Sequence, residues 1–326
     1  INKNILKKLD KDTYETKSVN AINLLTYNRF DVLAKYLYVK FKDKNIDSEF
    51  GKEIYLEHIK AFNGFVESDE SNKVGKDSFL KSFDNLIESL KKDGFAENSL
   101  IPLSSNSSIL DGAHRTAASI YFENKVNIMS SDLDEQIFDY KFFEERGLKR
   151  KYLDSMAYEY AKLKDNTFMI LLWPSSNGKE KELKNILDNY GNIIYRKDIF
   201  LTKNGSVNIV RKAYKFESWV GSNKDNFIGA QNKAEWCFNQ DGPLRVVLFE
   251  STKDLIEMKE EIRELYNIKK HAVHINDTKE ETLELAGLLF NENSINWLNF
   301  SNTRYFSWFD RLFNHYKKWL KSENLN

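Results

Sequence analysis

The sequence has almost no cysteine, little proline and no long apolar run, and each scarcity excludes a class of protein. One cysteine, Cys237, among 326 residues excludes an intrachain disulfide and a cysteine-based zinc site, so we expect a reducing, cytoplasmic setting. The longest apolar stretch, FMILLW at 168–173, is far too short to cross a bilayer. The chain starts at Ile1 rather than methionine, and we expect it to be a segment of a longer polypeptide.

Net charge is also lacking, since Lys+Arg and Asp+Glu both number 49. A protein that holds a nucleic-acid backbone normally carries a basic excess, so we expect no nucleic-acid partner. Hydrophobic residues make up 41% of the chain and aromatic residues 14%, enough for a sizeable core. The length fits one large domain or two moderate ones.

The first half of the chain changes from a helical to a mixed pattern. Residues 1–65 indicate helices, among them 28–41 with its apolar side chains on one face. An amphipathic helix then runs from Ser78 to a stop at Gly94. The elements that follow are short strands at 99–103, where Pro102 favours an edge position, at 108–110 and at 126–129, and a helix at 113–122. This order predicts a compact α/β unit.

The second half predicts another α/β domain. Strand patterns at 167–173 and 244–251 alternate with helical patterns that follow each of them. We therefore predict an α/β (α+β) protein with domains at 1–164 and 165–326. An aromatic stripe over 307–321 predicts a closing helix, packed on the core or on an upstream domain, or lying on a membrane surface.

The stretch SILDGAHRTAAS at 108–119 places Asp111 and Gly112 just before a predicted helix and His114 and Arg115 in its first turn. The first amides of a helix lack internal partners and carry partial positive charge, which suits an anion. Gly112 permits a turn and the close approach of a ligand. His114 and Arg115 can donate to phosphate oxygens, and Asp111 can hold magnesium or accept a proton. These features predict a polyphosphate site; the alternative is that Asp111 only caps the helix.

This unit resembles the ParB/sulfiredoxin superfamily, which includes free serine kinases. The resemblance covers about 79–129 and rests on FLKSFDNLIESLKKDG, LIPL and ILDGAHRTAA. It implies a ParB-like N-terminal domain in which the turn grips the phosphates of ATP or CTP, with contacts from Gly112, Ala113, His114, Arg115 and Thr116. Asp111 matches the acid of the kinase-type D-G-H-H-R pattern, in which Ala113 replaces the first histidine.

The whole segment resembles the C-terminal module of multidomain capsular-polysaccharide proteins of Campylobacter type. The stretches that carry this likeness are RKAYKFESWVGS, GAQNKAEWCF and HAVHINDTKEET. The resemblance implies ATP-dependent amide formation on a uronic acid. It also implies upstream domains of the same polypeptide and other capsule-synthesis enzymes as partners.

Three residues of the second half are candidates for binding the acceptor. Lys233 follows Gly229 by one helical turn, and Glu217 precedes a glycine-serine turn. His274 lies near the end of a strand, where α/β folds tend to place ligands. His271, three positions earlier on the same predicted strand, would face the opposite side, so a shared metal is not expected. Thr278 and Glu281 form a capping-box pattern that explains the polar residues after His274 by helix initiation alone.

These observations combine into one expected activity, the ATP-dependent joining of a sugar carboxylate to a small amine. ATP and Mg²⁺ would lie at the turn, where Asp111 would bind the metal or act as base. His114 and Arg115 would offset the charge of the transferred phosphoryl group. The alternatives are a small-molecule kinase of the ParB-like fold and a nucleotide-binding module without catalysis.

Overall fold

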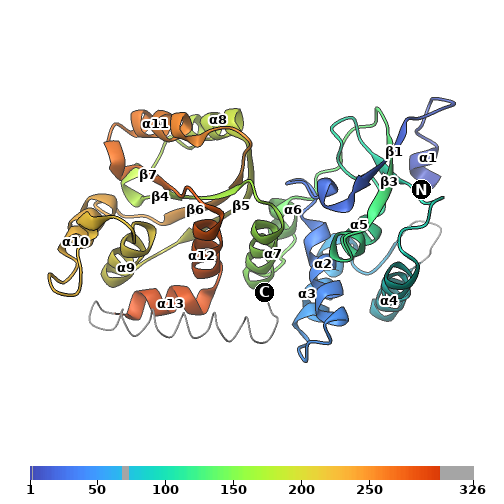
Figure 1. Cartoon of the computed structure of the whole chain (residues 1–326), viewed down its shortest axis with the longest axis horizontal. Helices are drawn as coiled ribbons and strands as arrows, with labels where there is room; N and C mark the ends of the chain where they lie inside the picture. The colour runs from blue at the N-terminus through green and yellow to red at the C-terminus, as the bar shows by residue number, and fades with distance from the viewer. Residues whose placement is uncertain (2, 68–72, 302–326) are drawn as a thin grey trace. The chain divides into compact units, whose positions relative to one another are not determined.

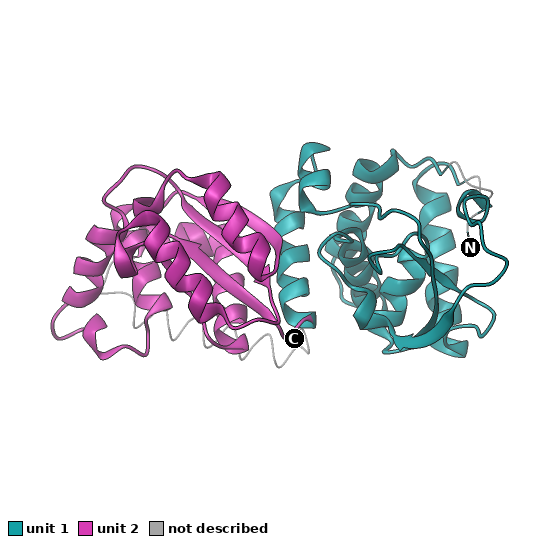
Figure 2. Cartoon of the chain, turned by 90° about the horizontal axis from the view of Figure 1, so that it is seen from above, with its two compact units in different colours: residues 1–163 teal, residues 164–326 magenta. Residues whose placement is uncertain are grey.

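The computed structural model describes residue 1, residues 3–67 and residues 73–301, and the chain divides into two compact units (Figures 1 and 2). Unit 1 comprises 1–163 and unit 2 comprises 164–326. The boundary lies one residue before the predicted one, because the last helix of unit 1 ends at Leu163 and the Lys164 amine lies 3.3 Å from a Glu250 carboxylate oxygen of unit 2. The helix predicted over 307–321 lies outside the described residues.

Unit 1 joins a small sheet to a larger set of helices. Its elements are α1 (Lys3–Leu6), β1 (Thr16–Asn20), α2 (Asp31–Asp43), α3 (Phe50–Asn63), α4 (Lys76–Asp93), β2 (Ile101–Leu103), α5 (Ala113–Tyr121), β3 (Lys125–Ser130), α6 (Tyr140–Glu145) and α7 (Arg150–Leu163). The sheet order is β1-β3-β2, with β1 antiparallel and β2 parallel to β3. Strand β2 is therefore an edge strand, as Pro102 predicted.

Two predictions for unit 1 were wrong. The stretch 108–110 is not a strand; it makes one isolated bridge, from Leu103 to Ile109, because the chain reverses tightly between Ser104 and Ser108 and then turns into α5. Strand β1 lies in a region predicted to be only helical. The amphipathic helix, by contrast, is α4, and it ends at Gly94, whose φ is +72°.

Unit 2 is built on a four-stranded sheet. Its elements are β4 (Thr167–Leu172), α8 (Glu180–Tyr190), β5 (Asn192–Ile199), α9 (Lys203–Ala213), α10 (Ile228–Cys237), β6 (Leu244–Glu250), α11 (Leu255–Tyr266), β7 (Val273–Ile275), α12 (Lys279–Leu289) and α13 (Glu292–Phe300). The strand order is β5-β6-β4-β7, and every pair of neighbours is antiparallel. Each unit thus combines helices with its own sheet, and the predicted α/β class is confirmed.

Helices cover the sheet of unit 2 on both faces (Figure 1). Side chains alternate along β4, so that Ile170 and Leu172 pack in a cluster with Leu183 of α8 and Met258 of α11. Helices α9 and α12 lie on the side of the other face, and α13 packs on these two helices (Figure 1). Among the described residues, no helix combines the length and the apolar character needed to cross a membrane.

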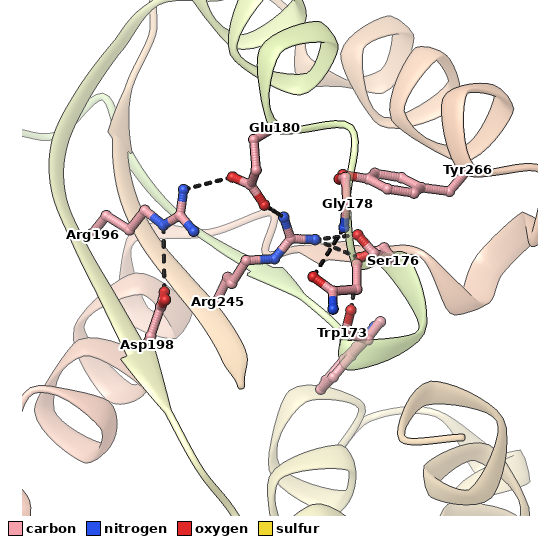
Figure 3. Close-up of polar contacts among 9 residues, drawn as sticks. Trp173, Ser176, Gly178, Glu180, Arg196, Asp198, Arg245 and Tyr266 are labelled. Atoms are coloured by element: carbon pink, nitrogen blue, oxygen red, sulfur yellow. Dashed lines mark hydrogen bonds and ion pairs between the residues drawn. The ribbon is translucent and has the colours of Figure 1, made fainter. Parts of the chain in front are cut away.

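A polar network fixes the connection from β4 to α8 (Figure 3). Arg245 of β6, with only 3% of its side chain exposed, donates to the Glu180 carboxylate and to the Ser176 carbonyl. Arg196 of β5 donates to the other Glu180 oxygen at 2.8 Å. The Tyr266 hydroxyl donates to the Gly178 carbonyl at 2.8 Å. One carboxylate in the first turn of α8 therefore joins this loop to two neighbouring strands.

This network predicts acid sensitivity of unit 2. Partial burial alone would raise the pKa of Glu180, but the hydrogen bond from Arg196 and the charge of Arg245 outweigh it and hold the pKa below its ordinary 4.5. The stabilisation is therefore present above about pH 4.5 and is lost as the pH falls below it. We expect Glu180→Gln to flatten the fall in unfolding free energy between pH 5 and pH 3, by less than about 1 kcal/mol because the carboxylate is half exposed.

Tryptophan fluorescence during urea unfolding measures this effect, because all six tryptophans lie in unit 2. Glu182→Gln is the control, since Glu182 is exposed on the same first turn of α8. If Glu180→Gln and Glu182→Gln show the same pH dependence, the network does not contribute as described.

Candidate functional site

The predicted turn begins α5 without a capping side chain. Gly112 is the N-cap residue, with φ +90°, and its amide donates to the Asp111 Oδ1 at 2.7 Å. The N-cap position is thus held by a residue without a side chain that could cap the helix, and Asp111 is the residue before it. The first residues of α5, Ala113, His114 and Arg115, line a cleft, so the positive end of the helix faces that cleft.

The Arg115 side chain holds the turn in place through hydrogen bonds to three neighbouring residues. Its guanidinium donates to the Ser99 hydroxyl at 2.7 Å, to the Leu100 carbonyl at 3.1 Å and to the Asp111 Oδ2 at 3.3 Å. These contacts join the start of α5 to the residues before β2. A Cβ atom on Gly112 would lie 2.8 Å from the Arg115 Nη2 and 2.5 Å from the Ile101 Cδ1, so the turn packs closely on both side chains.

His114 is a neutral ring packed among aromatic side chains. Its Nε2 lies 3.0 Å from the Tyr55 hydroxyl, and its ring meets the Phe83 ring edge-on at 4.6 Å. Burial, reinforced by the charges of Lys35 and Lys73, holds the pKa of His114 well below 6.5. His114 can thus exchange a hydrogen bond with a ligand, but it supplies no positive charge at neutral pH.

Thr116, the fourth residue of α5, is fully buried and is not among the residues that line the neighbouring cleft. The phosphate contact predicted for it stays a prediction that its burial does not favour. The contacts available at the turn are those of Asp111, Gly112, Ala113, His114 and Arg115, all of which line the cleft.

The cleft beside the turn has a volume of about 440 Å³. Among the residues that the structure describes, its lining includes the cations Arg29, Lys35, Lys73 and Arg115 and the carboxylates Asp31, Glu67 and Asp111. Its apolar wall comes from α3 and α4, including Tyr55, Ile59, Phe79 and Phe83. A helix N-terminus and several cations in one concave site suit an anion that carries several oxygens.

Sequence reasoning missed five charged residues of this cleft: Arg29, Asp31, Lys35, Glu67 and Lys73. The Arg29 guanidinium donates to both Asp31 oxygens, at 2.8 and 3.0 Å, and the Lys35 amine donates to one of them at 2.9 Å. Burial alone would raise the pKa of Asp31, but the two cations outweigh it and hold that pKa far below its ordinary range. The signal in the sequence was the i, i+4 spacing of Asp31 and Lys35 within a predicted helix.

In the described part of the chain, a magnesium ion could be bound only by isolated carboxylates and not by a group of protein ligands. Among the described residues, no group of three or more His, Cys, Asp or Glu side chains could hold a metal ion. Asp111, the predicted ligand, already accepts hydrogen bonds from Gly112 and Arg115. Magnesium that accompanies a nucleotide is typically bound by one or two carboxylates together with phosphates and water. Asp111 can supply one such oxygen.

Unit 2 brings the three predicted acceptor-binding residues into one cleft of about 740 Å³. Lys233 comes from α10, Glu217 from the residue before a 3₁₀ turn, and His274 from β7. The Lys233 amine donates to the Lys270 carbonyl at 2.5 Å and lies 3.4 Å from the His271 Nδ1. The predicted capping box of Thr278 and Glu281 is confirmed at the start of α12.

Aromatic rings form much of this second cleft. Trp236 lies over the His271 ring at 5.5 Å, and the Tyr214 ring contacts Trp219 at 5.1 Å and His274 at 4.7 Å. Trp219 and Trp236 remain 43% and 61% exposed. Such rings offer flat apolar faces to a ring-shaped ligand.

The described lining of the second cleft has as many acidic as basic charged side chains, and burial lowers the pKa of two of its basic residues, His274 and Lys233. The basic side chains are Lys233, Lys259, Arg263 and Lys270, and the acidic ones are Glu217, Glu260, Asp277 and Glu281. Burial, with the nearby charges of Lys259, Lys233 and Arg263, lowers the pKa of His274 to about 3. Burial also lowers the pKa of Lys233. His274 is therefore a neutral hydrogen-bonding group here.

Comparisons with protein-family models, with curated proteins and with solved structures found no match for this chain. The ParB-like and ligase-module resemblances therefore stay predictions, and function is argued from the two clefts.

We predict that Gly112→Ala destabilises unit 1 more than Gly147→Ala does. Both glycines have positive φ, +90° and +78°, so each substitution carries a backbone penalty of about 1 kcal/mol. Only at Gly112 would the new Cβ also displace Ile101 and Arg115, since nothing lies within 4 Å of the equivalent position at Gly147. Urea unfolding followed by far-ultraviolet circular dichroism measures the difference. Equal losses for the two variants would show that the turn does not need this close packing.

Proposed function

We propose that the cleft of unit 1 binds the phosphates of ATP and that the protein joins a carboxylate to an amine at the expense of ATP. The observation that carries the proposal is the N-terminus of α5 at Gly112, set in a cleft whose described lining includes the cations Arg29, Lys35, Lys73 and Arg115. A triphosphate presents several anionic oxygens to such a site, where amides and cations both donate to them. The turn admits no side chain at Gly112 because Ile101 and Arg115 fill that space, and Gly112 itself is one of the residues that line the cleft.

The proposed reaction has two steps. The acceptor carboxylate attacks the γ-phosphorus of ATP, the bond from that phosphorus to the β–γ bridging oxygen breaks, and ADP leaves with the electron pair. The amine then attacks the acyl phosphate carbon, and phosphate leaves as the amide forms and the amine nitrogen gives up a proton. Charge neutralisation and positioning supply most of the catalysis in such phosphoryl transfers. Asp111 is the candidate ligand for the magnesium of the nucleotide.

The cleft of unit 2 is proposed to bind the acceptor. Its aromatic rings suit the apolar face of a sugar ring, and the Lys233 amine suits a carboxylate. A balanced set of charges disfavours a triphosphate there and leaves recognition to shape and a few hydrogen bonds. The two clefts thus differ in the chemistry that they recognise.

The test of the activity uses the 326-residue chain with MgATP, a uronic acid such as D-glucuronate and ethanolamine. We expect ADP and phosphate in equal amounts and a product with the mass of the amide. A product heavier by one phosphoryl group, independent of the amine, would indicate a kinase instead. Bound ATP without turnover in the presence of both acceptors would indicate a binding module.

We predict that Trp236→Ala raises the KM for the acceptor about tenfold and leaves the Kd for ATP within twofold. The loss of one stacked ring accounts for about 1.5 kcal/mol, which corresponds to that factor. Phe300→Ala is the control, because Phe300 is another exposed aromatic side chain and does not line the cleft. An unchanged acceptor KM in Trp236→Ala would remove the cleft of unit 2 from the acceptor site.

A further inference from the structure

The start of α2 holds a buried ion cluster with more positive than negative charge. The side chains of Arg29, Asp31 and Lys35 are 4%, 1% and 3% exposed. Two cations thus share one carboxylate in a place that water hardly reaches. A buried charge that lacks a counter-charge is costly, because its desolvation is not offset by attraction.

Arg29 and Lys35 together have more N–H donors than the hydrogen bonds that they make with Asp31 and Ile109 use. A guanidinium has five N–H donors and an ammonium has three. Arg29 uses one donor on each of its three nitrogens, toward Asp31 and the Ile109 carbonyl. The Lys35 amine bonds to the carboxylate and to the backbone carbonyl of Asp31, at 2.9 and 3.2 Å. Both side chains line the cleft of unit 1. The Arg29 guanidinium also lies 5.3 Å from the centre of the Phe138 ring, and the Lys35 amine lies 5.6 Å from the centre of the Phe62 ring.

A further carboxylate of the cleft, Glu67, lies 2.7 Å from the Lys73 amine, and both side chains are about one quarter exposed. Burial lowers the pKa of Lys35, and the charges of Asp31 and, more weakly, Glu67 act against that effect. The positive character of the cluster also reaches its neighbours. After burial itself, the charge of Lys35 is the largest influence that lowers the pKa of both His58 and His114. The wall of the cleft near α2 is therefore electropositive.

We propose that Arg29 and Lys35, held in place by Asp31, form a seat, that is a binding site, for a phosphate group in the cleft of unit 1, which the first residues of α5 also line. A tetrahedral oxyanion has enough oxygens to accept from both cations and from the amides of the same cleft. Lys35 and Arg29 are binding residues in this reading, and Asp31 is a positioning residue. The seat deepens the nucleotide site proposed above and rests on it for the identity of the ligand as a terminal phosphate of ATP.

The competing explanation is that the cluster only fixes the start of α2. The two explanations predict different anion binding after removal of one cation. If the cluster only fixes the start of α2, Lys35→Met leaves anion binding unchanged, whatever its effect on stability. If the cluster is a phosphate seat, Lys35→Met keeps the fold at equal or higher stability but weakens anion binding about 10- to 100-fold, because one charge-assisted hydrogen bond is lost.

The experiment is calorimetric titration of the 326-residue chain with inorganic pyrophosphate and, separately, with MgATP at low ionic strength. Lys40→Met is the matched control. Lys40 lies on the same helix and is buried, and its amine donates to the Glu159 carboxylate at 2.5 Å. Neither Lys40 nor Glu159 lines the cleft. We expect Lys40→Met to lower the unfolding temperature and to leave both affinities within twofold. Lys35→Arg keeps the charge and should bind within about fivefold of the unchanged chain.

Each result decides one of the two proposals. Unchanged pyrophosphate and ATP affinities in Lys35→Met would overturn the seat and leave the nucleotide site standing. Binding of pyrophosphate but not of ATP by the unchanged chain, lost in Lys35→Met, would support the seat and overturn the nucleotide function. No binding of either ligand would overturn both. Should Lys35→Met fail to fold by circular dichroism, Lys35→Gln compared with Lys35→Arg gives the same test.

Discussion

The cleft of unit 1 depends on the buried guanidinium of Arg29. From the residues just before α2 it binds the Asp31 carboxylate and also donates to the Ile109 carbonyl, two residues before Asp111. One side chain therefore joins helix α2 to the segment that leads into the turn of α5. Because that bond is desolvated, its geometry is tightly specified, and the position of the turn relative to the helical wall of the cleft is specified with it.

Features that depend on a few neighbouring residues were predicted well from the sequence. Gly94 ends α4, Pro102 lies on an edge strand, and Thr278 and Glu281 form a capping box, because each acts within one turn or one strand. The antiparallel pairing of the unit 2 sheet was not predictable in this way, since strands and helices alternate in the sequence as in a parallel fold. Strand β1, TKSVN, has mostly exposed side chains and no apolar alternation, so its pairing with β3 left no local signal.

The candidate site shows the same division. The glycine turn before a helix was visible in the sequence, and so were Lys233, Glu217 and His274, which the fold gathers in one cleft. The protonation state of the titratable groups in the two clefts could not be predicted from the sequence. His114 and His274 are neutral because of burial, and Lys35 lies in the wall of a cleft although lysines on helices are normally solvated. Burial is a tertiary property, so the sequence indicated which residues could act but not in which protonation state.

The two clefts differ in a way that bears on function. An aromatic cleft with balanced charges selects a ligand mainly by shape, and its rings would serve that purpose at little cost to the fold. A buried excess of cations is different, because replacement of such charges by apolar groups is often neutral or stabilising. Stability alone therefore does not account for Lys35 beside Arg29 and Asp31. An anion that enters from solvent would complete the charge balance of that wall, and its binding would gain from a desolvated site that is already organised around Asp31.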